Sequence, residues 1–273
     1  MRFTKLQALG NDFICLDCTE RPLPADPDRL AVAMASRRLG VGADGLLCVL
    51  PGGEGRLRMV LYNADGSRAA MCGNGLRCLA AYAWAHGLAE AGAPLIVETD
   101  AGPRTLTAVP GGIRADMGRP VLEPSLRLEA AGRTWRVTPV SMGNPHGVVF
   151  LENIDGLDLE MVGPALEQHP AFPGGINVEF VQVITRDCLR MRVWERGSGE
   201  TLACGTGACA CFAAARRAGL CGDRVLARLP GGALALEERG SHVWMTGPAR
   251  AVFWGEFPLD GAAPRGGFPG PSA

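Results

Sequence analysis

The chain of 273 residues contains an internal repeat, and this feature limits its possible folds more than any other. The tetrapeptide CGNG at 72–75 returns as CGTG at 204–207, which places Cys72 and Cys204 132 residues apart. Three further anchors keep nearly this offset: GND at 10–12 with GNP at 143–145, Gly42 and Asp44 with Gly175 and Asn177, and YN at 62–63 with WE at 194–195. Shared order, spacing and cysteine chemistry outweigh chance matches among the glycines. We therefore predict two homologous halves, 1–117 and 118–260, and a disordered tail at 261–273.

Each half shows the same succession of short apolar runs separated by turn residues. Such runs, rich in β-branched and aliphatic residues, predict strands. They lie at 13–16, 46–50, 58–62 and 95–97 in the first half, and at 147–150, 180–183 and 189–193 in the second. Two shorter helices are predicted over 27–39 and 159–167.

A second pair of predicted helices follows the two cysteines. Ala-rich runs at 76–86 and 208–217 come directly after the two tetrapeptides and end near a glycine. Both are apolar nearly all round, which is typical of a helix buried at the centre of its half. Cys72 and Cys204 would then lie at helix N-termini, where free N–H groups and the helix dipole lower the pKa of a thiol. The adjoining glycines let backbone N–H groups form a cradle for a carboxylate.

Two matched thiols suit the inversion of an α-carbon. A proton must leave one face of the carbon and another must arrive at the opposite face, which requires one thiolate base and one thiol acid. A duplicated fold that closes on itself places such a pair on either side of a substrate. Because an α-hydrogen is only weakly acidic, the site must also be dry and preorganised.

Composition and charge indicate where these thiols work. The first residues carry charges where a signal peptide needs an apolar run, and no apolar stretch reaches the length of a membrane span. We therefore expect a cytoplasmic protein whose ten cysteines are reduced. A net charge of −1 with interspersed charges gives no footprint for nucleic acid or a membrane surface. Cys204, Cys209 and Cys211 form no C-x-x-C pattern and have no histidine nearby in the sequence, so no metal site is predicted.

These motifs together resemble the diaminopimelate epimerase family, over nearly the whole chain. The matching stretches are LGNDF at 9–13, GADG at 42–45, YNADGS at 62–67, MCGNG at 71–75, GNPH at 143–146, INV at 176–178, WERG at 194–197 and ACGTG at 203–207. The resemblance implies interconversion of LL- and meso-diaminopimelate in lysine and peptidoglycan synthesis, without pyridoxal phosphate, metal or another cofactor. It also implies a homodimer with a small-molecule substrate.

Site residues carried over from the resemblance fall into two groups. The residues at the reacting centre are Cys72, Cys204, His146 and Glu195. The substrate-binding residues are Asn11, Asn63, Gly73, Asn74, Asn144, Asn177, Glu195, Arg196, Gly205 and Thr206. A substrate with two ammonium and two carboxylate groups needs such amides, one acid and one arginine, whose fork suits the far carboxylate. Gly45 departs from the family, because some members have Gln there.

The expected fold is α+β: two pseudo-symmetric domains, each a curved mixed sheet around a central buried helix, with the active site in the cleft between them. A proline or hydroxyproline racemase is the alternative within this fold, although that family typically has His where Asn74 stands. A non-catalytic binding protein or a carboxylate-based isomerase is the alternative from another class. His146 is either a participant or a buried structural histidine. The other eight cysteines are interpreted as structural thiols. A reversible Cys72–Cys204 disulfide also stays open.

Overall fold

The computed structural model describes residues 1–90 and 92–258, so the predicted tail at 261–273 lies outside the described residues. The first half contains β1 (Arg2–Ala8), β2 (Asn11–Asp17), α1 (Pro27–Ala35), β3 (Gly45–Pro51), the 3₁₀ turn η1 (Gly53–Gly55), β4 (Leu57–Asn63), β5 (Arg68–Ala69), α2 (Gly73–Ala85), β6 (Leu95–Glu98), β7 (Arg104–Val109) and β8 (Gly112–Asp116). All four strands predicted in this half are present.

The second half repeats this order of elements. It contains β11 (Arg133–Ser141), β12 (Pro145–Phe150), α3 (Leu159–Glu167), β13 (Asn177–Thr185), β14 (Cys188–Glu195), β15 (Gly199–Thr201), α4 (Gly205–Arg217), β16 (Arg224–Leu229), β17 (Gly232–Arg239) and β18 (His242–Gly247). Three strands lie outside the repeat: β9 (Val121–Leu122), β10 (Leu126–Ala130) and β19 (Arg250–Glu256). The predicted α+β class is confirmed.

Strand pairing repeats as well. The parallel pairs β2–β3 and β4–β6 correspond to β12–β13 and β14–β16. Phe13 pairs with Gly45, and His146 pairs with Asn177. Asn177 therefore occupies the place of Gly45, not that of Asp44 as the sequence alignment had it. The reason is that the loop before β13 is one residue shorter than the loop before β3, counted from the aligned glycines Gly175 and Gly42.

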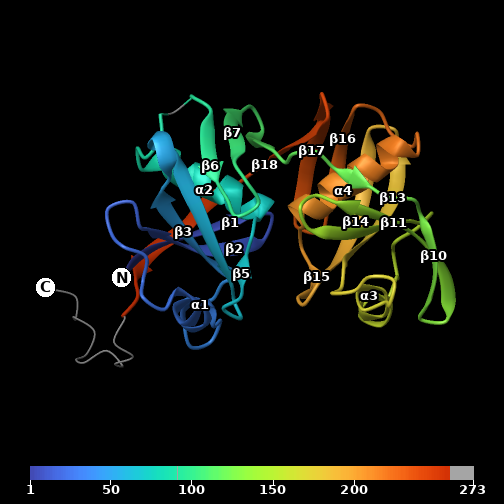
Figure 1. Cartoon of the computed structure of the whole chain (residues 1–273), viewed down its shortest axis with the longest axis horizontal. Helices are drawn as coiled ribbons and strands as arrows, with labels where there is room; N and C mark the ends of the chain where they lie inside the picture. The colour runs from blue at the N-terminus through green and yellow to red at the C-terminus, as the bar shows by residue number, and fades with distance from the viewer. Residues whose placement is uncertain (91, 259–273) are drawn as a thin grey trace, which may run out of the picture.

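The two halves share one hydrogen-bonded sheet. β8 pairs with β18 antiparallel, which joins the strands of the first half to those of the second. β19 returns to the first half and pairs antiparallel with β1. This pairing occupies the backbone N–H and C=O groups on an edge of β1 that would otherwise be open. The chain therefore crosses between the halves twice, after β8 and again after β18 (Figure 1).

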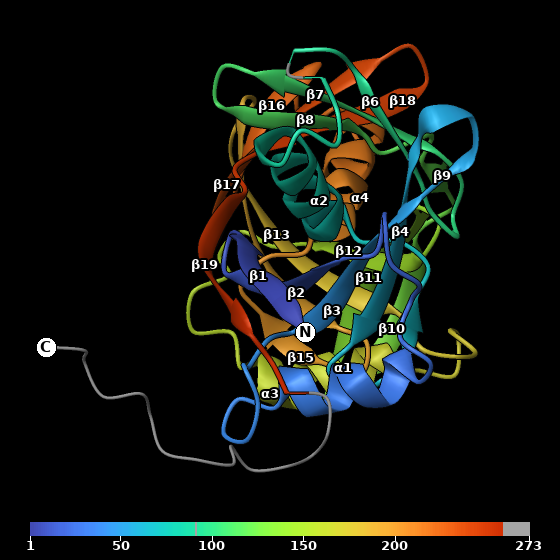
Figure 2. The same cartoon turned by 90° about the vertical axis from the view of Figure 1, so that its left-hand side faces the viewer.

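The helices after the cysteines lie at the centre of each half, as predicted. α2 packs against β1–β4, β7, β8 and β19, whereas α4 packs against β11–β13 and β16–β18. Figure 2 shows the two helices side by side, and they contact each other directly. Both begin three residues earlier than predicted, immediately after Cys72 and Cys204, because each cysteine serves as the N-cap. Among the described residues, no helix combines the length and apolar character that a membrane crossing requires.

α1 ends at Ala35, four residues before the predicted end at Leu39. Ser36 adopts ψ 117°, which stops the helix. The chain then turns so that the Arg37 guanidinium reaches the carboxylates of Asp12 and Asp44 at 2.9 and 2.8 Å. Long-range ion pairing thus outcompetes the helical propensity of the last predicted turn. α3 begins and ends at the predicted residues.

Candidate active site

Each predicted catalytic thiol caps one of the two central helices. Cys72 Sγ accepts a hydrogen bond from the backbone N–H of Gly75 at 3.4 Å, and Cys204 Sγ accepts one from Gly207 at 3.3 Å. Asn74 Nδ2 donates to the carbonyl of Ala203 at 3.0 Å, which ties the start of α2 to the residue before Cys204. The two thiols are therefore held at neighbouring helix starts from opposite halves of the chain.

One cavity of about 990 Å³ brings nearly all the predicted site residues together. Both cysteines line it, and so do every predicted substrate-binding residue and Glu195. Residues of both halves form its walls, in agreement with the expected position between them. His146 is the one predicted residue that does not line the cavity, because its side chain is fully buried behind the wall. Gly45 is not among the lining residues either.

Amide side chains surround Cys72 in the first half. The Cys72 thiol lies 3.8 Å from Asn11 Oδ1, which also accepts from Asn74 Nδ2 at 3.1 Å. Asn11 Nδ2 donates to Asp44 Oδ2 at 2.8 Å. The buried Arg77 guanidinium holds the Asn74 amide oxygen at 2.6 Å. The Asn74 side chain thus links Asn11, Arg77 and the backbone of Ala203.

The side around Cys204 is organised differently. Thr206 Oγ1 lies 3.5 Å from Cys204 Sγ and accepts from Asn144 Nδ2 at 3.3 Å. Asn177 accepts from the backbone N–H of Arg196 at 2.9 Å, which fixes the turn that follows β14. At the end of β14, the Glu195 carboxylate accepts from the Thr201 hydroxyl.

Behind this wall lies a buried pair that sequence reasoning had only half identified. His146 Nδ1 lies 2.7 Å from Glu179 Oε1, and His146 Nε2 lies 3.0 Å from Asn144 Oδ1. A ring nitrogen of His146, a carboxylate oxygen of Glu179 and the sulfur of Cys204 all lie within 4.8 Å of one another. A histidine distant in sequence therefore does approach Cys204. Glu179 was missed, although a lone carboxylate inside the apolar run NVEFV is a recognisable signal.

The expected lowering of the thiol pKa values is wrong, because the pKa of each thiol is raised. Burial is the largest influence and raises the pKa of both thiols. The Glu195 carboxylate raises both pKa values further, and Glu179 adds to the effect on Cys204, whose pKa lies well above the ordinary value. Hydrogen bonds from Gly75 and Gly207 act in the opposite direction but do not prevail. Helix N-termini therefore moderate the penalty of burial and do not reverse it.

This result predicts slow alkylation of the ligand-free protein. Because only the thiolate reacts, we expect Cys72 to react with iodoacetamide at pH 7 more slowly than N-acetylcysteine does. Its rate should keep rising as the pH passes 9.0, the ordinary pKa of a cysteine. Peptide mapping by mass spectrometry across a pH series measures this directly. Faster reaction than the free thiol at pH 7 would contradict the raised pKa.

The first-half rim of the cavity carries charged side chains that were not predicted as site residues. Arg37, Asp44, Asp65 and Arg68 all line it. Arg68 forms an ion pair with Asp100 at 2.6 Å. Asp44 and Asp65 lie inside the motifs GADG and YNADGS. The ion pairs of Arg37 with Asp12 and of Arg68 with Asp100 join residues far apart in the sequence, so no local pattern marks these two arginines. All ten cysteines are free thiols, including Cys72 and Cys204.

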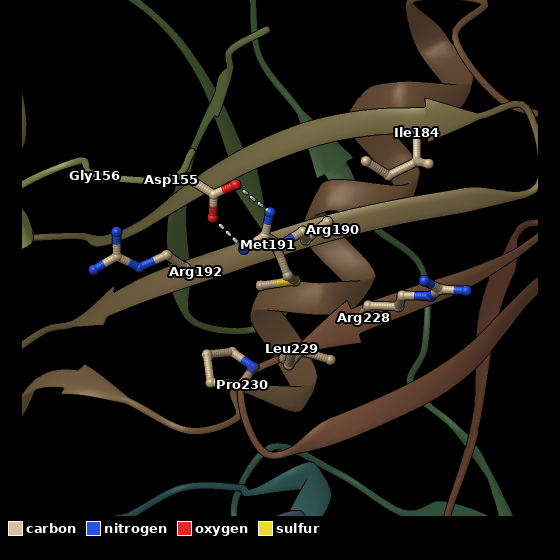
Figure 3. A pocket seen from close by; sticks show the side chains of 9 residues that line it. All are labelled: Asp155, Gly156, Ile184, Arg190, Met191, Arg192, Arg228, Leu229 and Pro230. Carbon is tan, nitrogen blue, oxygen red and sulfur yellow. Dashed lines mark hydrogen bonds and ion pairs between the residues drawn. The ribbon is translucent and has the colours of Figure 1, made fainter. Parts of the chain in front are cut away.

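A second cavity of about 740 Å³ lies on the other side of the second-half sheet and contains none of the predicted residues. Figure 3 shows Asp155 bridging to Arg190 across this cavity, with Ile184, Met191 and Leu229 as its apolar surface. It offers no thiol and no amide. Of these two cavities, only the one between the halves is lined by thiols and amides.

Comparison with known proteins agrees with this geometry. The family model described as diaminopimelate epimerase matches residues 3–123 and 138–252. The chain is 49% identical to the diaminopimelate epimerase of Moorella thermoacetica, covering 95% of this chain and 100% of that one. It is 47% identical to that of Pelotomaculum thermopropionicum, covering 94% and 99%.

Solved structures of more distant proteins share the fold. A probable proline racemase from Agrobacterium radiobacter K84 superposes with a TM-score of 0.75 at 17% identity, covering 96% of this chain and 94% of that one. A hydroxyproline epimerase from Agrobacterium vitis gives 0.71 at 17% identity, covering 97% and 92%.

Proposed function

The chain belongs to the diaminopimelate epimerase family, and we propose that it interconverts LL- and meso-diaminopimelate by proton transfer between Cys72, the α-carbon and Cys204. The observation that carries this mechanism is the position of both thiols at neighbouring helix starts on one cavity. As a member of this family the chain is an isomerase of lysine biosynthesis. One cysteine removes the α-proton as a thiolate while the other delivers a proton to the opposite face as a thiol.

The α-carboxylate of the substrate fits between the two helix starts. Gly73, Asn74, Gly205 and Thr206 line the cavity in the first turns of α2 and α4, where backbone N–H groups have no partner within the helix, and this supports an anion cradle. Negative charge on the carboxylate grows toward an enediolate as the α-proton leaves, so these donors stabilise the transition state more than the ground state. The substrate ammonium would meet Glu195, and its positive charge would offset the carboxylate that raises both thiol pKa values.

The far end of the substrate is assigned to the amides and the arginine at the mouth of the cavity. Asn63, Asn144 and Asn177 line it from both halves, and Arg196 lies exposed beside them. The Arg196 guanidinium donates to the Gly174 carbonyl at 3.0 Å, which leaves further donors for a carboxylate.

One experiment tests the activity and its chemistry together. The purified protein is incubated with LL-diaminopimelate in D₂O under reducing conditions, without added pyridoxal phosphate, and followed by NMR. Deuterium at the α-carbon together with meso product is the expected result. Exchange with proline or hydroxyproline but not with diaminopimelate would keep the fold and overturn the substrate. Asn74, held by Asn11 and Arg77, occupies the position where the proline racemases typically have His.

Arg196→Lys tests the assignment of the distal carboxylate. A lysine ammonium cannot donate two parallel hydrogen bonds, so we expect KM for diaminopimelate to rise about tenfold, with a smaller change in kcat. Steady-state kinetics in both directions measure it. Arg228→Lys, outside the catalytic cavity, serves as the matched control. An unchanged KM would show that Arg196 does not hold the substrate.

We also propose that the enzyme is a homodimer in the cytoplasm. β19 pairs with β1 alone among the described strands, and it exposes Val252, Phe253 and Trp254, the last to 81%. A second copy would cover this apolar edge. Trp254→Glu should therefore lower the mass measured by sedimentation while the circular dichroism spectrum is kept. The reducing cytoplasm suits an enzyme that needs two free thiols.

A further inference from the structure

Glu179 is a buried carboxylate that the proposed mechanism does not use. It lies on β13 with no exposed surface, and its Oε1 atom contacts His146 Nδ1 at 2.7 Å. Its Oε2 atom has no hydrogen-bond partner among the described residues. Burying a carboxylate with an unpartnered oxygen is costly, and an apolar residue of similar size would usually be more stable there.

The repeat shows that the fold itself does not require this pair. Strand register places Leu47 where the second half has Glu179, and Phe13 where it has His146. Leu47 and Phe13 pack as ordinary buried apolar residues in the first half. The same architecture therefore holds an apolar pair in the first half, and the His146–Glu179 pair stands only in the half that carries Cys204.

The carboxylate is drawn close to the start of α4. A Cβ atom at Gly207 would lie 2.5 Å from Glu179 Oε1, so only glycine at this position lets the carboxylate approach. The N–H of the same Gly207 donates to Cys204 Sγ at 3.3 Å. The N-terminal dipole of α4 thus stabilises two neighbouring groups, the Glu179 carboxylate and the Cys204 sulfur.

A chain of contacts leads from this carboxylate to the thiol. With Glu179 ionised its carboxylate can only accept, so Nδ1–H of His146 would donate to it, and this would fix the orientation of the ring. The opposite nitrogen, Nε2, lies 3.0 Å from Asn144 Oδ1, which can only accept, so in this chain of contacts Nε2 would also carry a proton and donate to Asn144. Asn144 Nδ2 in turn donates to Thr206 Oγ1 at 3.3 Å. Thr206 Oγ1 lies 3.5 Å from the Cys204 sulfur.

We propose that Glu179 is a positioning residue for the epimerisation, acting through His146 to hold Asn144 and Thr206 in place around Cys204. The inference rests on the proposed role of Cys204 as acid and base. Carboxylates that orient metal-binding histidines contribute about 10- to 100-fold to affinity or activity, and we take the same scale for a carboxylate that orients a histidine without a metal.

Glu179→Gln tests this directly. Glutamine keeps the shape but offers a donor as well as an acceptor, so it no longer selects a proton on His146 Nδ1. We expect kcat to fall about 10- to 100-fold with KM nearly unchanged. Glu179→Asp keeps the charge but withdraws the carboxylate, and it should lower kcat as well. Glu237→Gln, at an ion-paired glutamate of β17 outside the cavity, is the control for loss of a charge.

A double-mutant cycle separates positioning from a general structural effect. If Glu179 acts through His146, Glu179→Gln should cost little further activity in a His146→Gln background. Equal losses in both backgrounds would overturn the proposal. So would a kcat within twofold of wild type for Glu179→Gln.

The pH profile gives an independent readout. Glu195, Glu179, His146 and Thr206 surround Cys204, and both carboxylates raise its pKa. Removing the charge of Glu179 should therefore move the alkaline limb of kcat/KM to lower pH, whereas Glu179→Asp should not. An unmoved limb in Glu179→Gln would count against the proposal. If the wild-type protein shows no α-deuterium exchange, the proposed function fails. If the wild-type protein exchanges deuterium and the Glu179→Gln variant has the same kcat and pH profile, only the inference about Glu179 fails.

Discussion

Cys72→Ser and Cys204→Ser should each lower the epimerisation rate by about 10³-fold or more. A serine hydroxyl is a far weaker acid than a thiol, and a positioned acid or base contributes about 10²- to 10⁴-fold. Both cysteines cap buried helices through a hydrogen bond that a serine oxygen can also accept, so the fold should survive the change. Coupled assay of meso product, with circular dichroism for folding, measures the effect.

The control for this pair is Cys188→Ser. Cys188 is a partly buried thiol on β14 outside the catalytic cavity, so the variant should keep wild-type turnover. Near-normal turnover in either active-site variant would overturn the two-base mechanism. Loss of structure in only one of them would show that this cysteine also stabilises its helix.

Glu195→Gln should lower kcat by about 10²-fold and change the pH dependence. Its carboxylate raises the pKa of both thiols, and burial raises its own pKa. Without this charge both thiols lose their protons at lower pH. The reaction needs one thiol in the protonated form, so the alkaline limb of kcat/KM should move to lower pH. A profile that keeps its alkaline limb would show that Glu195 does not act on the thiols electrostatically.

The two central helices and most of the residues that line the cavity between the halves could be predicted from the sequence. The two tetrapeptides and the Ala-rich runs are local signals, and they predicted the capped helices α2 and α4 because capping and helical propensity are decided within a few residues. The same motifs identified twelve residues that line one cavity. Their convergence followed from the repeat, since equivalent positions in two halves face a common cleft.

Long-range effects could not be predicted in this way. The pairings β8–β18 and β1–β19 depend on which edges remain open once each half has formed. The raised thiol pKa values depend on burial and on carboxylates whose distance from the thiols no spacing in the sequence reveals: Glu195 of β14 for both thiols, and Glu179 of β13 in addition for Cys204. Hydrogen bonds at the helix N-termini do lower the thiol pKa values, as the local sequence predicted, but burial raises these pKa values by more.

The return of β19 to β1 determines the order in which the protein can be completed. Residues 118–247 form an uninterrupted insertion between two segments of the first half, and Met1 N–H and Phe257 C=O meet at 2.6 Å. During synthesis the inserted half can close on itself while the first half still lacks its last strand. The first half therefore cannot be completed before β19 has been synthesised, so one edge of β1 lacks its partner until then. A circular permutant that joins the two termini and opens near Arg119 would remove this delay.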